Sequence, residues 1–137
     1  MAVGSIGSTF CVSIDATGDA AGQLTHTLTV GRPCQVLLIE LIFTTVAAGN
    51  VTIQSDTTGS AGFANMVAAT AIEINNVALV AQTISSGAGA MVLAPTGNAT
   101  LTSDAGKISI TTSSNCAYVA RFICTAQTPT ALTVTSA

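Results

Sequence analysis

The sequence predicts an all-β fold, a jelly-roll-like antiparallel β-sandwich of about eight to ten strands. Three observations predict it. Short segments rich in Val, Ile and Thr recur between turn residues, no segment has the apolar spacing of an amphipathic helix of normal length, and no fixed-period repeat indicates a solenoid. A chain of 137 residues fits one domain that is large enough to bury a core.

Residues 1–8 form a Gly/Ser-rich arm, which we expect to be flexible or bound to a partner, ahead of a single sandwich domain at 9–137. The arm has neither the basic start nor the apolar stretch of a secretory signal. We therefore expect a soluble chain made inside a cell, where thiols stay reduced.

Two alternating strands follow the arm. In residues 10–15 every second side chain is apolar, which is the pattern of a half-buried strand. Residues 24–30 repeat the pattern with threonines at the polar positions, after a segment of turn composition at 16–22. The sequence Gly31-Arg32-Pro33 ends the second strand, because proline has no N–H to give to the ladder.

The longest apolar run, Gln35 to Thr45, has no alternation at all. A strand that is covered on both faces has this pattern, and β-branched residues favour strand over helix. The face expected in the core consists of Leu37, Ile39, Leu41 and Phe43. The other face consists of Val36, Leu38 and Ile42, with Glu40 among them. We expect this second face to be an interface with another copy of the chain or with a neighbouring protein.

The rest of the chain supplies further strands and turns. Residues 50–56 are expected to return antiparallel to the central run across a short turn. Residues 57–69 are small and Gly/Ala-rich, with Phe63, Met66 and Val67 as anchors, and we expect one helical turn there. The remaining expected strands are 71–74, 77–84, a brief one at Leu101, and the hairpin 107–112 and 116–124. Residues 85–100 are expected to be a Gly/Ala-rich loop interrupted by Met91–Leu93, and Leu132 and Val134 mark a last short strand or a tail.

The two longest hairpins, 35–56 and 107–124, lie far apart in the sequence. Jelly rolls pair such distant strands in one sheet, which predicts that 35–45 lies antiparallel to 116–124. Glu40 and Arg121 each sit near the middle of their strand among apolar residues. We expect them to form an ion pair, because an unpaired charge in such surroundings is costly.

Few residues are charged: 7%, where about 25% is usual. The polar surface must therefore consist mainly of hydroxyls and amides, and such a chain is typical of proteins that work in an assembly rather than as free monomers. Three basic residues and a net charge of −3 argue against nucleic-acid binding. The apolar run from Cys34 to Ala48 is shorter than the roughly 20 residues of a membrane span.

No motif indicates catalysis, a metal or a cofactor. His26 is the only histidine, and no nucleophile or carboxylate accompanies it in the sequence, so we expect a hydrogen-bonded core or interface histidine. Asp56-Thr57-Thr58-Gly59 has one Thr too many for the aspartic-protease motif, and a hairpin turn explains it better. We therefore expect a protein that is not an enzyme.

The four cysteines show no close C-x-x-C spacing of the kind that binds zinc. Cys116 and Cys124 lie on one predicted strand, too far apart to bridge each other. We expect free thiols, while a bridge between Cys11 and Cys34 stays open as the alternative.

The short arm, the Ala/Thr/Gly/Val-rich sandwich and the closing hairpin, Asp104 to Ile110 followed by Tyr118 to Phe122, resemble the jelly-roll decoration (cement) proteins of tailed-phage capsids. The resemblance implies homotrimers on the capsid exterior, assembled in the host cytoplasm, that clamp subunits of the major capsid protein. It also implies that the arm, with Val3 and Ile6, contacts the shell. The second face of the central strand would then lie at the trimer axis.

The alternative is a trimeric jelly-roll adhesin, or a receptor- or glycan-binding module of a phage fibre or a spore surface. Sugar-binding sandwiches usually display exposed aromatic side chains. The aromatic residues of this chain are Phe10, Phe43, Phe63, Tyr118 and Phe122. Most of them fall on predicted inward faces, which favours the decoration protein.

Overall fold

The structure is a computed structural model that describes residues 4–6, 9–16, 24–45, 49–72, 89–113, 116–126 and 130–132. Within these ranges all regular structure is β, which confirms the predicted fold class. Val3, Val134 and the strand expected at 77–84 lie outside the described residues.

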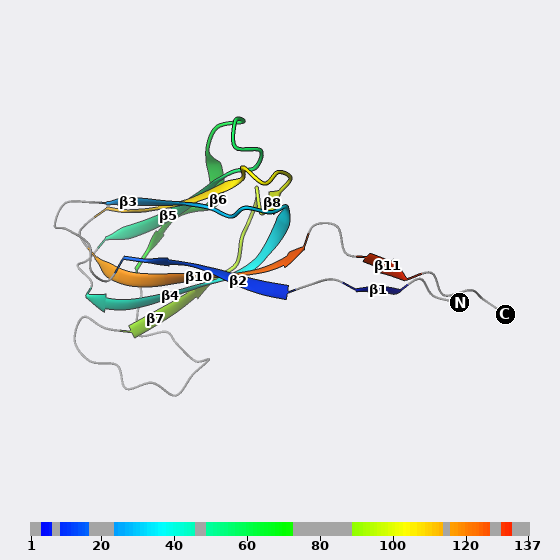
Figure 1. Ribbon diagram of the computed structural model, residues 1–137. Helices are drawn as coiled ribbons and strands as arrows, with labels where there is room; N and C mark the ends of the chain where they lie inside the picture. Colours follow the sequence, from blue (N-terminus) through cyan, green and yellow to red (C-terminus); the bar gives the residue numbers. More distant parts are fainter. Residues whose placement is uncertain are drawn as a thin grey trace.

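Two antiparallel sheets pack face to face (Figure 1). Sheet I consists of β2 (Thr9–Asp15), β10 (Ala117–Ala126), β4 (Cys34–Thr45) and β7 (Gly89–Leu93), in that order, and the short β8 (Thr100–Leu101) also pairs with β4. Sheet II consists of β3 (Thr25–Thr29), β9 (Lys107–Thr112), β5 (Asn50–Asp56) and β6 (Ala64–Ala71).

Leaving out β8, these eight strands have the order of a jelly roll, in which two interleaved Greek keys distribute the strands over two sheets. The predicted pairing of 35–45 with 116–124 is confirmed, since β10 lies antiparallel to β4 with Arg121 opposite Glu40. The predicted hairpin of 35–45 and 50–56 is wrong, because β4 and β5 belong to different sheets. The same holds for the predicted hairpin of 107–112 and 116–124, whose strands β9 and β10 are also in different sheets.

The inward faces of both sheets form one apolar core. Its largest fully buried side chains include Tyr118, Phe43, Phe122, Ile39, Leu41, Ile53, Met66, Ile108 and Ile110. Burying each of these side chains contributes roughly 1.5–3 kcal/mol. His26 of β3 is partly buried, and its Nδ1 lies 3.0 Å from the hydroxyl of Tyr118, with the two rings edge to face. It is the hydrogen-bonded histidine that the sequence predicts.

A β-bulge changes the predicted faces of the central strand. The register between β10 and β4 shifts so that Ile123 lies opposite Leu38 and Cys124 opposite Val36, which leaves Leu37 without a partner. An extra residue reverses the inward and outward positions on one side of a bulge. Val36 is therefore 2% exposed and part of the core, whereas Leu37 is 45% exposed. The sequence predicts the opposite for both residues.

Two other predictions about local structure are wrong. The segment 57–69 contains no helical turn, because its second half is the start of β6. Met66 and Val67 are buried anchors as expected, but Phe63 is exposed. The β5–β6 loop is instead held by Asp56, whose Oδ1 accepts hydrogen bonds from the N–H groups of Gly59 (2.9 Å) and Ala61 (3.0 Å).

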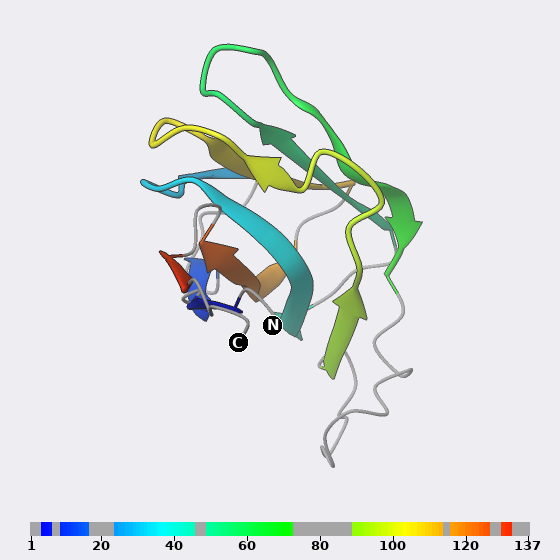
Figure 2. The same ribbon diagram turned by 90° about the vertical axis from the view of Figure 1, so that its right-hand side faces the viewer.

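The segment between β7 and β8 closes one flank of the sandwich, as the view from the side of the termini shows (Figure 2). The N–H of Val36, on the inner strand β4 of sheet I, donates to Ala99 O at 2.8 Å. The N–H of Thr96 donates to Met66 O at 2.9 Å, on the edge of sheet II. One loop therefore hydrogen-bonds to main-chain groups of both sheets, on β4 of sheet I and on the edge strand β6 of sheet II.

The two ends of the chain meet in a small ribbon. β1 (Gly4–Ile6) pairs antiparallel with β11 (Thr130–Leu132), with Ile6 opposite Thr130. Figure 1 shows this ribbon projecting from one end of the sandwich. Part of the predicted arm is thus paired with the C-terminal segment, and the last strand expected at Leu132 is β11.

Candidate interaction surface

The outward face of sheet II is polar. Its outward residues are Thr25, Thr27 and Thr29 of β3, Lys107, Ser109 and Thr111 of β9, and Thr52 and Gln54 of β5. Hydrogen bonds link neighbouring strands across this face. The hydroxyls of Thr25 and Thr111 lie 3.0 Å apart, and Gln54 Nε2 donates to Oδ1 of Asn65 in β6 at 3.0 Å. Hydroxyls and amides on this face suit contact with water.

The outward face of sheet I is mainly apolar in the middle. We call it the apolar face and define it by Leu37, Leu38 and Ile42 of β4, Val119 and Ile123 of β10, and Val92 of β7. All except the exposed Leu37 are half-buried in the isolated chain. The sequence predicts Leu38 and Ile42 on this face. Its third predicted residue, Val36, lies in the core instead.

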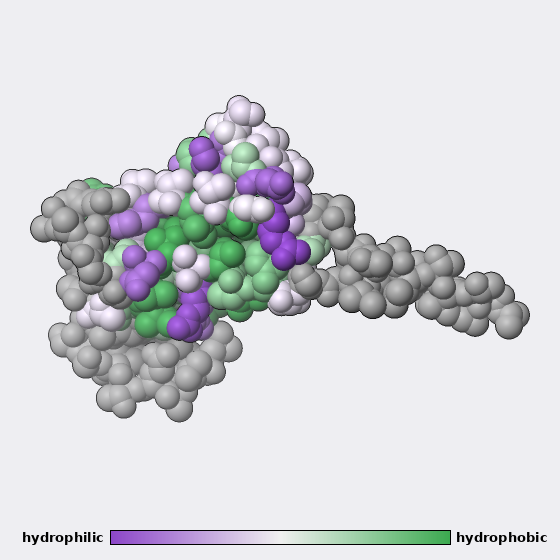
Figure 3. All heavy atoms as spheres, in the orientation of Figure 1, coloured by the Kyte–Doolittle hydropathy of each residue, from purple (hydrophilic) through white to green (hydrophobic). Residues whose placement is uncertain are grey.

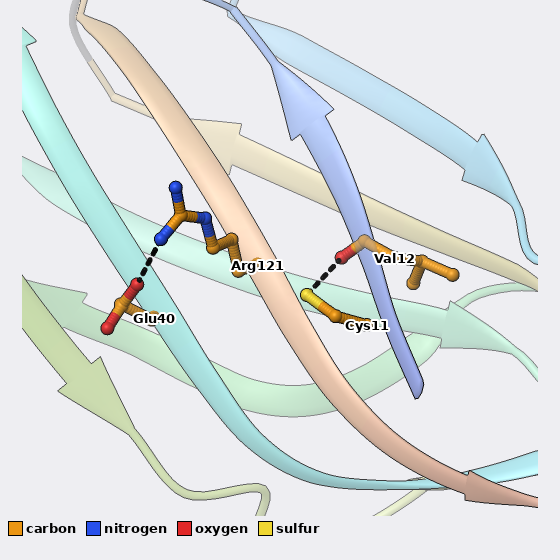
Figure 4. Close-up of polar contacts among 4 residues, drawn as sticks. All are labelled: Cys11, Val12, Glu40 and Arg121. Carbon is orange, nitrogen blue, oxygen red and sulfur yellow. Dashed lines mark hydrogen bonds and ion pairs between the residues drawn. The ribbon is translucent and has the colours of Figure 1, made fainter. Parts of the chain in front are cut away.

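The apolar face surrounds one ion pair. Arg121 on β10 donates from an Nη atom to Glu40 Oε1 on β4 at 3.2 Å (Figure 4). The structure therefore contains the ion pair that the sequence predicts. Its setting is more open than expected, because the side chains of Arg121 and Glu40 are 52% and 29% exposed. In a single chain, such a pair contributes only about 0–1 kcal/mol.

A second apolar area lies along the flank where β2 and β3 are the edge strands. Figure 3 looks onto this flank and shows apolar residues reaching the surface between the sheets, with hydrophilic residues scattered around them. The half-buried Phe10 and Val12 come from β2, and Leu28 comes from β3. The guanidinium of Arg32 lies over the Phe10 ring, 4.5 Å from its centre.

The structure describes all four cysteines, and none of them is in a disulfide. Cys11 is exposed on the outward side of β2, across the ladder from Ile123. Cys34 and Cys124 are buried in the core. A hydrogen bond between these two thiols lowers the pKa of Cys34 and raises the pKa of Cys124, to which burial adds. Their position inside the core makes them packing residues.

No cluster of chemically active side chains emerges in the part of the chain that the structure describes. It contains no group of three or more His, Cys, Asp or Glu residues that could hold a metal ion. The described residues also contain no helix that is long and apolar enough to cross a membrane. Of the aromatic residues, only Phe63 is exposed, at 45%, while Phe43, Tyr118 and Phe122 are in the core.

Sequence reasoning missed four residues of the apolar face. Val119 and Ile123 carried a signal, because both flank Arg121 at outward positions once β10 is paired with β4. Val92 was missed because the pairing of β7 with β4 was not predicted. No sequence signal placed Leu37 on this face, because a bulge inside an uninterrupted apolar run does not change the hydropathy pattern.

No protein-family model, no curated protein and no solved structure matches the chain.

Proposed function

We propose that the chain is a viral structural protein, a decoration (cement) protein that binds the outer surface of a capsid and stabilises the shell. The observation that carries the proposal is the difference between the outward faces of the two sheets. Hydroxyls and amides dominate one face, whereas the middle of the other carries aliphatic side chains around the Glu40–Arg121 ion pair, with Ser13 and Asp15 at its β2 edge. A protein that works as part of an assembly needs one surface for water and one for neighbours.

The composition and the fold support the same role. With three basic and six acidic residues, the chain has little charge to keep it soluble as a free monomer. The jelly roll is common among viral capsid proteins, although it also occurs in lectins and in cupins. The core position of Phe43, Tyr118 and Phe122 leaves few aromatic side chains for a sugar site, which weighs against the adhesin alternative.

The proposed partner on the shell is the major capsid protein, and the proposed contact is the N-terminal arm. Ile6 lies in the ribbon that projects from the sandwich, and Val3 precedes it in the sequence (Figure 1). An extended segment with open main-chain groups can add to a strand of a partner. On this proposal the protein lies on the exterior of the virion.

The test uses empty capsids assembled from the major capsid protein of the genome that encodes this chain. We expect the purified protein to sediment with the capsids at a fixed ratio and to raise the temperature at which they break. Removing residues 1–8 should abolish this binding, while the far-UV spectrum of the sandwich stays unchanged. Absence of co-sedimentation of the full chain, or of a capsid gene in that genome, would contradict the proposal.

A further inference from the structure

We infer that the apolar face is where two copies of this chain pack against each other, with Glu40 of each copy over Arg121 of the other. The proposed contact is a twofold, face-to-face packing of two copies of sheet I. It concerns the free protein in solution and holds whether or not the protein binds a capsid.

The first argument is the position of the aliphatic side chains. On β4 and β10 they form two rows on either side of the ion pair, because Leu38 lies opposite Ile123 and Ile42 lies near Val119. Glu40 lies opposite Arg121 between these rows. All four aliphatic side chains remain partly open to water in the single chain. A second apolar surface of the same kind would remove them from water.

The second argument is that the face is complementary to itself. Its two charges are of opposite sign and lie side by side, one on β4 and one on β10. A twofold axis parallel to the strands, between β4 and β10, places β10 of a second copy over β4 of the first. Each Glu40 then meets the Arg121 of the other copy. A twofold contact uses the same patch on both copies, which this charge arrangement allows.

The same geometry excludes the other simple arrangement. A twofold axis in the plane of the sheet but across the strands would place Glu40 over Glu40 and Arg121 over Arg121. Like charges brought together in a contact disfavour it strongly. The aligned packing is also the ordinary way in which two sheets stack, with strand directions within about 30° of each other.

The third argument is the contrast with sheet II. At its corresponding outward positions, sheet II carries Thr27, Ser109 and Thr111, and its hydroxyls bond to one another across strands. Ser109 is only 5% exposed between its neighbours, whereas Thr27 is exposed and Thr111 half-exposed, so hydroxyls also form the water-facing surface of this sheet. The bulge residue Leu37, which is 45% exposed, extends the aliphatic surface of sheet I further.

The size of the face sets the expected strength. The three strands of the apolar face, about 4.8 Å apart and roughly eight residues long, cover about 380 Å² of plane, before the relief of the side chains is counted. Standard interfaces bury about 800 Å² per partner. We therefore expect a pair that dissociates on dilution. Because the charge arrangement fits a twofold axis, we expect two copies in place of the threefold assembly that the resemblance to decoration proteins implies.

The experiment uses two charge variants of the full chain, Glu40→Arg and Arg121→Glu. The first has two cations at the centre of the face, and the second has two anions. Each alone should self-associate at least about tenfold more weakly than the natural protein. An equimolar mixture should restore association, because a doubly positive face meets a doubly negative one. An ion pair that acts only within one chain gives no association on mixing.

The readout is mass by light scattering at roughly 100 μM chain, well above a micromolar dissociation constant. We expect twice the chain mass of 13.5 kDa for the natural protein and for the mixture, and a shift toward 13.5 kDa for each variant alone. Asp104→Arg changes the net charge as much as Glu40→Arg, but at an exposed turn, and should leave the pair intact.

Melting curves of both variants check that the sandwich is folded, which is expected because the exposed ion pair contributes little within one chain. If a variant does not fold, Ile42→Glu replaces it and should likewise give the single-chain mass. A natural protein that stays at 13.5 kDa, a threefold mass, or a mixture that remains dissociated would overturn the inference.

Discussion

The two outward faces of this sandwich have the same architecture and opposite chemistry. On sheet II, Thr25 and Thr111 hydrogen-bond across strands, and Thr27 and Ser109 do so at 3.5 Å. On sheet I, the corresponding ladder positions carry aliphatic side chains around one ion pair. Both faces keep their strands well paired, so the difference does not serve the sheet itself. We attribute the difference to what each face contacts, which is the premise of the proposed twofold pair.

The largest effect on stability should come from placing a charge at a core position of β4, compared with the same charge at the neighbouring position on the apolar face. Val36→Asp places a charge in the core and should destabilise the fold by at least about 3 kcal/mol, or prevent folding. Its neighbour Leu37→Asp places the same charge on the exposed bulge and should change stability by less than about 1 kcal/mol. Urea unfolding of both variants at high dilution, where copies are separate, measures the difference. Equal losses would mean that the bulge is absent.

A smaller effect, dependent on pH, is expected at the loop of sheet II. Burial would raise the pKa of Asp56, but the N–H groups of Ala61 and Gly59 donate to the carboxylate and hold its pKa below the ordinary 3.8. The unfolded chain lacks these donors. This carboxylate therefore stabilises the fold above about pH 4, and the contribution is lost as the pH falls through the folded pKa.

Asp56→Ala should accordingly lower the melting temperature at pH 7, and the gap to the natural protein should narrow as the pH falls toward 2. Asp56→Asn retains an oxygen that can accept the same hydrogen bonds and serves as the control. Melting curves from pH 2 to 7 give the comparison. If the difference in melting temperature between Asp56→Ala and the natural protein stays constant with pH, the negative charge of Asp56 does not contribute to the stability of the fold.

The smallest effect on stability should come from the ion pair on the apolar face. Because Glu40 and Arg121 are partly exposed, Glu40→Ala should cost the single chain less than about 1 kcal/mol. The sequence alone, which places the pair in apolar surroundings, predicts about 3–5 kcal/mol. Unfolding at high dilution, where copies are separate, measures the value for one chain. A loss above roughly 2 kcal/mol would indicate a dry site.

Much of the fold followed from local patterns. The alternation in 10–15 and 24–30 predicted β2 and β3, and the uninterrupted run at 35–45 predicted a strand with two apolar faces. The pairing of β4 with β10 followed from the jelly roll. β6 was not predicted, because its alanine-rich sequence has a weak preference for strands and its neighbours in sheet II decide its conformation.

The candidate site was predictable only in part, for two physical reasons. Val36 and Leu37 are both apolar, so their hydropathy does not reveal which of them points inward, and the bulge that decides it depends on β10. The pairing of Glu40 with Arg121 could be predicted from the antiparallel pairing of the two strands. The exposure of the two side chains could not, because it depends on whether other parts of the chain cover the outward face of sheet I. Turn residues gave strand ends, whereas the residues that meet on the outward face of a sheet depend on strand pairing that local sequence does not contain.

Labelling of single thiols tests most directly whether one outward face is covered and the other is not. Cys11 is a natural probe on the outward side of sheet I, and Thr27→Cys places a thiol on the polar face of sheet II. The rate of alkylation of each thiol, followed by peptide mass spectrometry, is measured as the protein concentration rises. We expect Cys11 to become protected while the thiol at position 27 keeps a constant rate. Equal and constant rates at both positions would contradict a covered apolar face.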